Sequence, residues 1–562
     1  MAGLALLTYL PFASTNAQIP SPLENAASVE GRVKFLYDQK RFTEAAQLAA
    51  SDSSPSANLL VYRGLSLARL GQLPAAEEIF QNGSQTYPKD KRFPLELAGI
   101  AYRQKETSRA KRFLHRALSL DPHDDYGNDF LGTLYSLDGN LTAALFYWNR
   151  AGKPVLQNVN FEPLPPLKPL LRERTFALSG GQTLTPERLR LAESNVNRLS
   201  VLADVQYELV PSKQNDRYDL LIRTVPMAQP LAGWLGQVLP SLRQLPYLGL
   251  AYDAYNLHGA AVNVNVLGRW DPNKRRVFAQ LRGPWRENPR TEYRFFVDVR
   301  DETWNLRANY FSFPGGLNNL LLRKAQAGGD FALGLSSKLQ WTLGGSVAYR
   351  DYGRAPRNSL FARGWSAELN NRFDYLLWSW PDHRLRVDSF ASLRTGRFFS
   401  QLPSRLITTH IGARAVWLPQ AKGDRYVLTQ QVGAGRTFGT APLDELFILG
   451  MERDNERDLW LRGTVGTRDG RKGNAPMGTQ YAIAQTDFSR KLFEVPFLRG
   501  YVGPFFDVGA VGDPSHRYGS RGVLYDTGLQ ATLKTLGSVK LTLVYGRDIV
   551  NGRGVFYTAV SR

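Results

Sequence analysis

The sequence contains no cysteine among its 562 residues. A disulfide framework, a thiolate metal site and a catalytic thiol are therefore excluded. The six histidines are scattered, and no two of them have the spacing of a helical metal site. We also find no P-loop, no Gly-x-Ser-x-Gly motif and no metal-binding motif. The sequence therefore indicates a protein that is not an enzyme and has no cofactor.

Long apolar runs are missing too. No stretch of 18 or more apolar residues occurs, so we expect no membrane-spanning helix. Residues 1–17 are nevertheless typical of a signal peptide, because Leu4–Phe12 is apolar and Thr15-Asn16-Ala17 is a small-residue cleavage site. Export without such a helix leaves the periplasm, the cell exterior or an outer-membrane barrel as the location.

Acidic residues are fewer than basic ones, and the net charge is +20. The basic residues are spread singly along strand-like segments, without a basic helix or a dense Lys/Arg run. This distribution fits the interior of a barrel and contacts with lipid headgroups better than a nucleic-acid groove. We expect outer-membrane lipid, including lipopolysaccharide, as a partner and no nucleic acid.

The N-terminal third contains a repeat of 34 residues. Small residues recur where two helices of a hairpin would approach closely, and a large residue recurs where it would fill the groove between them. These positions are Gly64, Ala98 and Gly132, then Ala76, Ala110 and Ala144, and then Phe80, Leu114 and Trp148. The pattern resembles the tetratricopeptide repeat, and we assign such an array to residues 25–154. The array implies a docking surface for a periplasmic or client protein, with a simple spacer as the alternative.

A proline-rich stretch leads into a segment with the predicted order strand, helix, helix, strand, strand. Thr185-Pro186-Glu187 supplies the capping residue and the first-turn proline of the second helix. The pattern Gly-x-x-Leu-Thr, continued by Val-x-Tyr-x-Leu-Val-Pro, resembles a polypeptide-transport-associated (POTRA) domain. We assign it to residues 155–226 and a linker to residues 227–247. The resemblance implies that client proteins add a strand to the edge of its sheet.

From about residue 248 onward, apolar and polar residues alternate. Tyr293–Arg300 is apolar at odd positions and mostly charged at even positions, and Val262–Val266 alternates valine with asparagine. The segments are about 10 residues long, the length that a tilted membrane-spanning strand needs. Aromatic residues near the segment ends are typical of interfacial girdles. Charged residues on one face suit a wet lumen better than a dry core. We therefore predict an antiparallel transmembrane β-barrel over residues 248–562.

The alternation predicts sixteen strands, with 291–300, 303–312 and 327–336 as three separate strands. A long gap, residues 439–476, is rich in charge and glycine, and a loop of this length usually has a function.

Several motifs of the barrel resemble the BamA/TamA superfamily, also called the bacterial surface antigen family. Asn256-Leu257-His258-Gly259 is similar to its opening turn, and Leu461-Arg462-Gly463 is similar to the tip of its long loop, with Thr464 in place of the aromatic residue. Phe505–Gly509 resembles the Phe-x-Asp-x-Gly strand that follows. The resemblance implies that the loop folds into the lumen and that its arginine is held by an acid on the barrel wall. We expect Arg462 to pair with Asp507, or with Asp487 as second choice.

Two functions remain open at this stage. The family resemblance implies insertion of outer-membrane proteins or translocation of polypeptides, with a seam between the first and last strands that can open. Gly552 and Gly554 would weaken the last strand there. The alternative is a passive conduit that exports polysaccharide through a barrel linked to a tetratricopeptide array.

Overall fold

The computed structural model describes residues 28–212, 217–227, 248–306, 317–356, 358–399, 404–451, 460–495, 498–514, 520, 522–535 and 540–561. The predicted signal peptide and nearly all of the predicted linker at 227–247 lie outside these residues. The chain divides into two compact units, residues 1–134 and 135–562.

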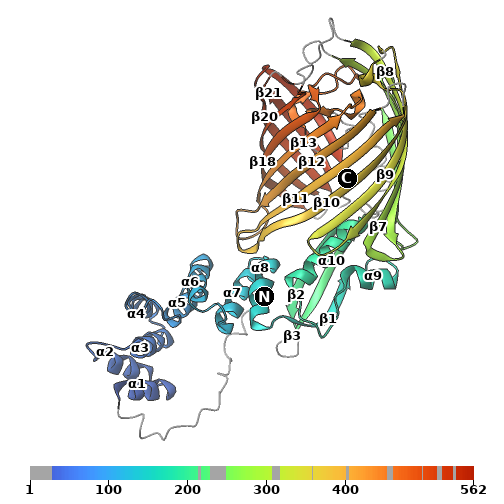
Figure 1. Cartoon of the computed structure of the whole chain (residues 1–562). Coiled ribbons are helices and arrows are strands. Elements are labelled where there is room, and N and C mark those ends of the chain that lie inside the picture. The colour runs from blue at the N-terminus through green and yellow to red at the C-terminus, as the bar shows by residue number, and fades with distance from the viewer. Residues whose placement is uncertain are drawn as a thin grey trace. The chain divides into compact units, whose positions relative to one another are not determined.

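The first unit consists of helices that pack as consecutive hairpins (Figure 1). They are α1 (Val29–Asp38), α2 (Phe42–Ala50), α3 (Ala57–Arg69), α4 (Leu73–Thr86), α5 (Arg92–Arg103), α6 (Thr107–Leu120) and α7 (Asp125–Leu137), which crosses the unit boundary. Gly64 is required for close packing, because a Cβ atom there would lie 2.4 Å from the ring of Phe80. The other predicted packing residues, Ala76, Ala98, Ala110, Gly132, Ala144 and Trp148, are also buried. None of the described helices is long and apolar enough to cross a bilayer.

The second unit begins with α8 (Leu141–Trp148) and a small α+β domain. The domain comprises β1 (Val155–Glu162), α9 (Pro169–Phe176), α10 (Pro186–Leu199), β2 (Leu202–Pro211) and β3 (Arg217–Pro226). Its sheet has the order β1-β3-β2, with β1 parallel and β2 antiparallel to β3. Thr185 caps α10 by accepting a hydrogen bond from the backbone N of Arg188. β2 lies at one edge of this sheet, and at the other edge β1 is partly covered, because Leu156 exchanges backbone hydrogen bonds with Gly181 and Gln182.

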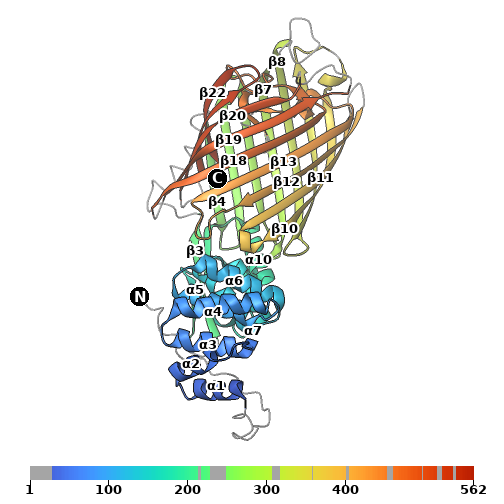
Figure 2. The same cartoon turned by 90° about the vertical axis from the view of Figure 1, so that its left-hand side faces the viewer.

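The remainder of the second unit is one antiparallel sheet of 15 strands among the described residues. In chain order these are β4 (Gly249–Leu257), β5 (Val262–Asp271), β6 (Lys274–Trp285), β7 (Asn288–Leu306), β8 (Leu317–Gly334), β9 (Leu339–Gly353), β10 (Gly364–Trp380), β11 (Leu385–Phe399), β12 (Ser404–Trp417), β13 (Tyr426–Gly439), β18 (Gln480–Val495), β19 (Leu498–Gly512), β20 (Leu524–Thr535), β21 (Lys540–Asp548) and β22 (Arg553–Ser561). Each strand pairs with its chain neighbour, and the sheet curves round into a barrel (Figures 1 and 2). β4 and β22 are its two ends, and no pairing joins them within the described residues.

The expected sixteen strands need one correction. The predicted strands at 291–300 and 303–312 overlap a single strand, β7, which continues to Leu306. The charged residues Arg300, Asp301 and Glu302 interrupt the apolar pattern, but they remain in the ladder opposite β8. β8 correspondingly begins at Leu317 and not at 327. The alternation was lost there because these strands extend beyond the apolar band, so their outward positions need not be apolar.

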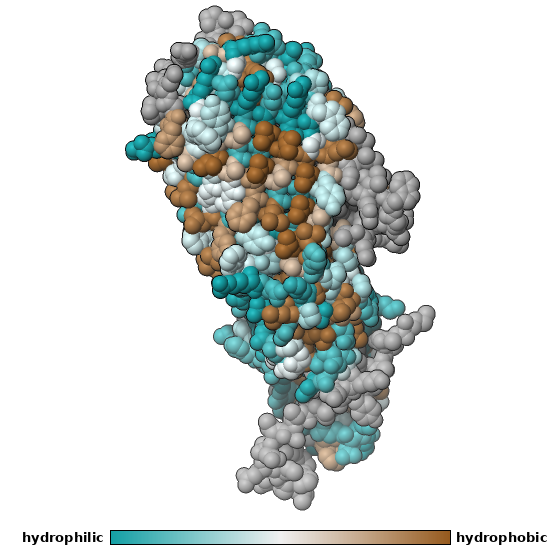
Figure 3. Space-filling view, turned by 90° about the vertical axis from the view of Figure 1, so that its right-hand side faces the viewer, coloured by the Kyte–Doolittle hydropathy of each residue, from teal (hydrophilic) through white to brown (hydrophobic). Residues whose placement is uncertain are grey.

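The two faces of the sheet differ in polarity. On β7, Phe295, Val297 and Val299 point outward and are about half exposed, whereas Asp298 points inward and is 2% exposed. Figure 3 shows an apolar band across the barrel surface with a hydrophilic region above it. An apolar exterior around a charged interior is the reverse of a soluble core, and it is typical of a barrel surrounded by lipid.

Turns at one end of the barrel contact the helices of the second unit. The buried Arg198 on α10 donates from Nε to the backbone O of Pro289 at 3.2 Å, and Asn263 donates to the backbone O of Leu199 at 2.8 Å. On α8, Tyr147 donates to Asp382 at 2.6 Å, and burial and this bond raise the pKa of Tyr147. The end of the barrel that carries these turns is called the domain end below.

Candidate functional site

The segment between β13 and β18 lies inside the barrel. Its short elements are η5 (Leu443–Glu445), β14 (Phe447–Ile448), β15 (Gly450–Met451), β16 (Leu461–Val465) and β17 (Met477–Gly478). β14 pairs with β17, and β15 pairs with β16. β16 is almost wholly buried and contacts β19, β20, β21 and β22. We call residues 440–479 the lumen loop, of which 452–459 lie outside the described residues.

Arg462 on β16 is held by acids of the barrel wall. Its backbone N and its Nε donate to Oδ2 of Asp507 at 3.0 and 2.8 Å, and its Nη2 bonds Oδ1 of the same carboxylate. Nη1 forms an ion pair with Asp487. The guanidinium also lies over the ring of Phe505, 4.1 Å from its centroid. Because Asp507 is fully buried, the fork-shaped pair compensates a charge that would otherwise be costly.

Gly463 fits β16 tightly against the wall. Its backbone N donates to Oδ2 of Asp526 at 2.6 Å. A Cβ atom at this position would lie 2.5 Å from the backbone carbon of Arg547 on β21. The strand therefore approaches β21 as closely as a backbone without a side chain allows.

The structure thus brings together all five residues of the expected loop site. Leu461 is fully buried in an apolar cluster with Phe447 and Ile483, and Arg462 contacts both expected acids. Asp526 belongs to the same site but was missed, because the alternation places it inward without showing what it faces.

No protein-family model and no curated protein matches the chain. Among solved structures, it is similar to BamA from Haemophilus ducreyi, in a crystal structure lacking POTRA domains 1–3, at 14% identity. That match covers 73% of this chain and 85% of that chain, with a TM-score of 0.39. It is also similar to CdiB from Escherichia coli, at 14% identity over 72% of this chain and 75% of that chain, with a TM-score of 0.42. Likeness at this level carries no functional conclusion, so we infer the function from this chain's own residues.

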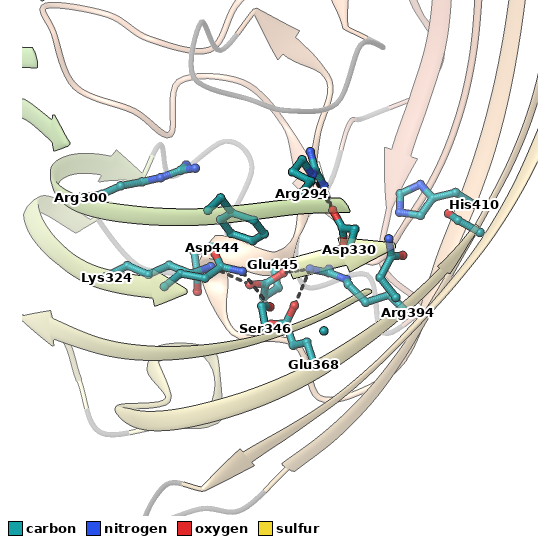
Figure 4. Close-up of a pocket in the computed structure, with 15 residues that line it drawn as sticks. Arg294, Arg300, Lys324, Asp330, Ser346, Glu368, Arg394, His410, Asp444 and Glu445 are labelled. Atoms are coloured by element: carbon teal, nitrogen blue, oxygen red, sulfur yellow. Dashed lines mark hydrogen bonds and ion pairs between the residues drawn. The ribbon is translucent and has the colours of Figure 1, made fainter. Parts of the chain in front are cut away.

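A second set of buried charges, absent from the sequence-based expectation, holds the start of the lumen loop (Figure 4). Oε1 of Glu445 accepts from Nη2 of Arg350 at 2.9 Å and from Lys324 at 3.0 Å, and Oε2 pairs with Arg394 at 2.6 Å. The neighbouring Asp444 pairs with Lys324 at 2.9 Å. Arg350 is fully buried. The only available signal was a pair of acids between Leu443 and Leu446, whose apolar flanks indicate burial.

A third contact fixes the end of the loop. Lys472 pairs with Glu302 on β7 at 2.7 Å, and both side chains are buried. The backbone of Lys472 also exchanges hydrogen bonds with Thr303 and Asn305. The three contacts lie on β8–β11, β18–β20 and β7, so the lumen loop crosses the interior of the barrel.

Proposed function

We propose that the chain is a BamA/TamA-type barrel of the outer membrane that inserts proteins into the membrane or translocates polypeptides. In this proposal the apolar band lies in the bilayer and the domain end faces the periplasm. The N-terminal helices act as a tetratricopeptide array, the α+β domain acts as a POTRA domain, and both gather partners or clients.

The observation that carries the proposal is the position of β16. An open conduit gains nothing from a loop that is fixed by buried ion pairs inside its lumen. A barrel that handles polypeptides needs its lumen closed between clients, and it needs a wall that can respond when a client arrives. Arg462 can serve both purposes, closing the lumen and responding to a client. It holds β16 inside the lumen, and β16 contacts the last four strands, including the edge strand β22.

The ends of the sheet supply a place for a client strand. β4 and β22 both have an unpaired edge within the described residues. An unpaired edge can take up an additional strand by backbone hydrogen bonding. Because no pairing joins β4 to β22 within the described residues, taking up a client strand there needs no hydrolysis.

A polysaccharide conduit is the second candidate, and one cavity favours it. A lumen cavity of about 730 Å³ is lined by the amides of Asn265, Gln280 and Asn370, by Tyr255 and Phe278, and by the charged side chains of Asp253, Arg276, Arg294 and Arg372. Amides beside aromatic rings suit a chain rich in hydroxyl groups. The lumen loop counts against this candidate, because it occupies the interior that a conduit would keep open.

Depletion of the protein followed by quantitative proteomics of the outer membrane and the secreted fraction tests the proposal. We expect the level of at least one other barrel or secreted protein to fall, with recovery by the wild-type chain and weaker recovery by Arg462→Gln. If no protein changes while a surface polysaccharide disappears, the conduit is correct and the proposal is wrong.

A further inference from the structure

Two arginines face each other on the outside of the barrel. Arg397 on β11 and Arg405 on β12 are direct cross-strand partners, and both are exposed. They share the outer face with Leu393 and Ile407, which are 44% and 46% exposed. Like charges directly opposite each other on one face of a sheet destabilise the pair.

One neighbouring outward pair at the same end of the barrel is balanced, whereas Arg397 and Arg405 are not. On β8 and β9 the outward Arg323 and Asp351 are register partners, and Asp351 also pairs with Arg363 at 3.6 Å. By contrast, no acidic partner of Arg397 or Arg405 is found among the described residues. The residue opposite Arg397 on its other side is Ala367 on β10. The pair is therefore a site of uncompensated positive charge.

The surroundings of the pair are amphipathic. Arg397 and Arg405 lie near the end of their strands that is remote from the domain end, just beyond the outward apolar side chains. Phe399 and Trp365 are register partners beside them, more than half exposed, and the Arg397 guanidinium lies 5.3 Å from the centre of the Phe399 ring. Exposed aromatic residues beside cations are typical of the level of lipid headgroups.

We propose that Arg397 and Arg405 together bind a phosphate of lipopolysaccharide in the outer leaflet. Two guanidinium groups can share one phosphate through paired N–H···O bonds, which removes their mutual repulsion. Phe399, Trp365 and Ile407 then contact the sugar and acyl parts of the same lipid. The inference rests on the proposed outer-membrane location, and it names a lipid site that the proposed function does not require.

Binding of lipid A to the purified full chain in detergent, followed by native mass spectrometry, tests the site. The variant is R397Q/R405Q, and the matched control is Arg490→Gln. Arg490 is also exposed and outward-facing and lies over an aromatic ring, that of Tyr426 at 5.9 Å, but it is at the domain end. Heat-modifiability on gels shows that each variant retains a folded barrel.

We expect the double variant to bind phosphorylated lipid A roughly tenfold or more weakly, and Arg490→Gln to bind like the wild type. Dephosphorylated lipid A should bind the wild type weakly, and inorganic phosphate should not compete if the lipid is the source of the phosphate. Equal binding by the wild type and the double variant, or no binding by the wild type, would overturn the site. Neither result bears on the depletion experiment, so the proposed function is tested separately.

Discussion

The start and the middle of the lumen loop are held by the same chemistry with opposite signs. At the start, the loop supplies the acids Asp444 and Glu445, and the wall supplies Lys324, Arg350 and Arg394. Near the middle, the loop supplies Arg462, and the wall supplies Asp507 and Asp487. Because the loop carries acids at one anchor and an arginine at the other, it fits against the barrel wall in one position only. An exchange of the two anchors would place like charges of the loop and the wall together.

Substitution of the two acids at the start of the loop should reduce the stability of the barrel most. D444N/E445Q would leave Lys324, Arg350 and Arg394 close together after the loss of two of their carboxylates. Glu368 would remain as a partner of Arg394 at 3.2 Å and of the fully buried Arg350 at 3.8 Å. Removal of one side of a buried ion pair costs about 3–5 kcal/mol. We expect a large drop in the temperature at which the barrel unfolds on heat-modifiability gels. Asp469→Asn is the control, because that loop carboxylate is 82% exposed. An equal effect of both variants would mean that the buried acids do not anchor the loop.

Substitution of Arg462, in the middle of the loop, should cause the next largest loss of stability. Arg462→Gln would leave Asp507 buried without its partner, at a cost of about 2–5 kcal/mol. Arg462→Lys should restore only part of the stability, because an ammonium group cannot form the fork-shaped pair. Arg468→Gln, in the same loop but exposed, should have no effect. Full rescue by lysine would show that charge alone, without the fork geometry, holds the middle of the loop.

The close approach at Gly463 gives a smaller effect that is independent of charge. Gly463→Ala would force β21 or β16 to move, and overpacking of this kind costs about 1–3 kcal/mol. The measurement is the same unfolding temperature, together with protease access to the lumen loop. Gly268→Ala is the control, because no atom lies within 4 Å of a Cβ atom there. Unchanged protease access in Gly463→Ala would contradict the tight fit.

The contact at Lys472 should have an effect similar in size to that of Gly463→Ala. Lys472→Gln breaks one ion pair with Glu302, while the backbone hydrogen bonds to Thr303 and Asn305 remain. We expect a loss of about 1.5–3 kcal/mol at most, the value of a hydrogen bond to a charged group. A larger loss than that of Arg462→Gln would show that the end of the loop, and not its middle, is the main anchor.

The comparison also shows which parts of the site the sequence could predict. The resemblance of the motifs around Arg462 and Asp507 to a known family predicted that Arg462 pairs with Asp507, or with Asp487 as second choice. Lys324 fell between two predicted strands, and no local pattern singled out Arg350 or Arg394 as partners of Asp444 and Glu445. Pairing between a loop and distant strands depends on how the chain crosses the lumen, and local periodicity carries no information on that path.

The fold was predictable to a similar degree. Small residues at a spacing of 34 marked close helix packing, which the contact of Gly64 with Phe80 explains. The strand at 288–306 was divided in two, because a charged stretch beyond the apolar band resembles a turn. The hydrogen bond from Tyr147 on α8 to Asp382 joins residues far apart in the sequence, and no local pattern indicates it.

Single-channel conductance of the purified full chain in a planar bilayer tests most directly whether the lumen loop closes the barrel. We predict a small, flickering conductance for the wild type and a large, stable one for D444N/E445Q/R462Q, in which the start and the middle of the loop are released. A wild-type conductance that is already large and stable, and unchanged in the triple variant, would contradict the closed lumen and favour a conduit.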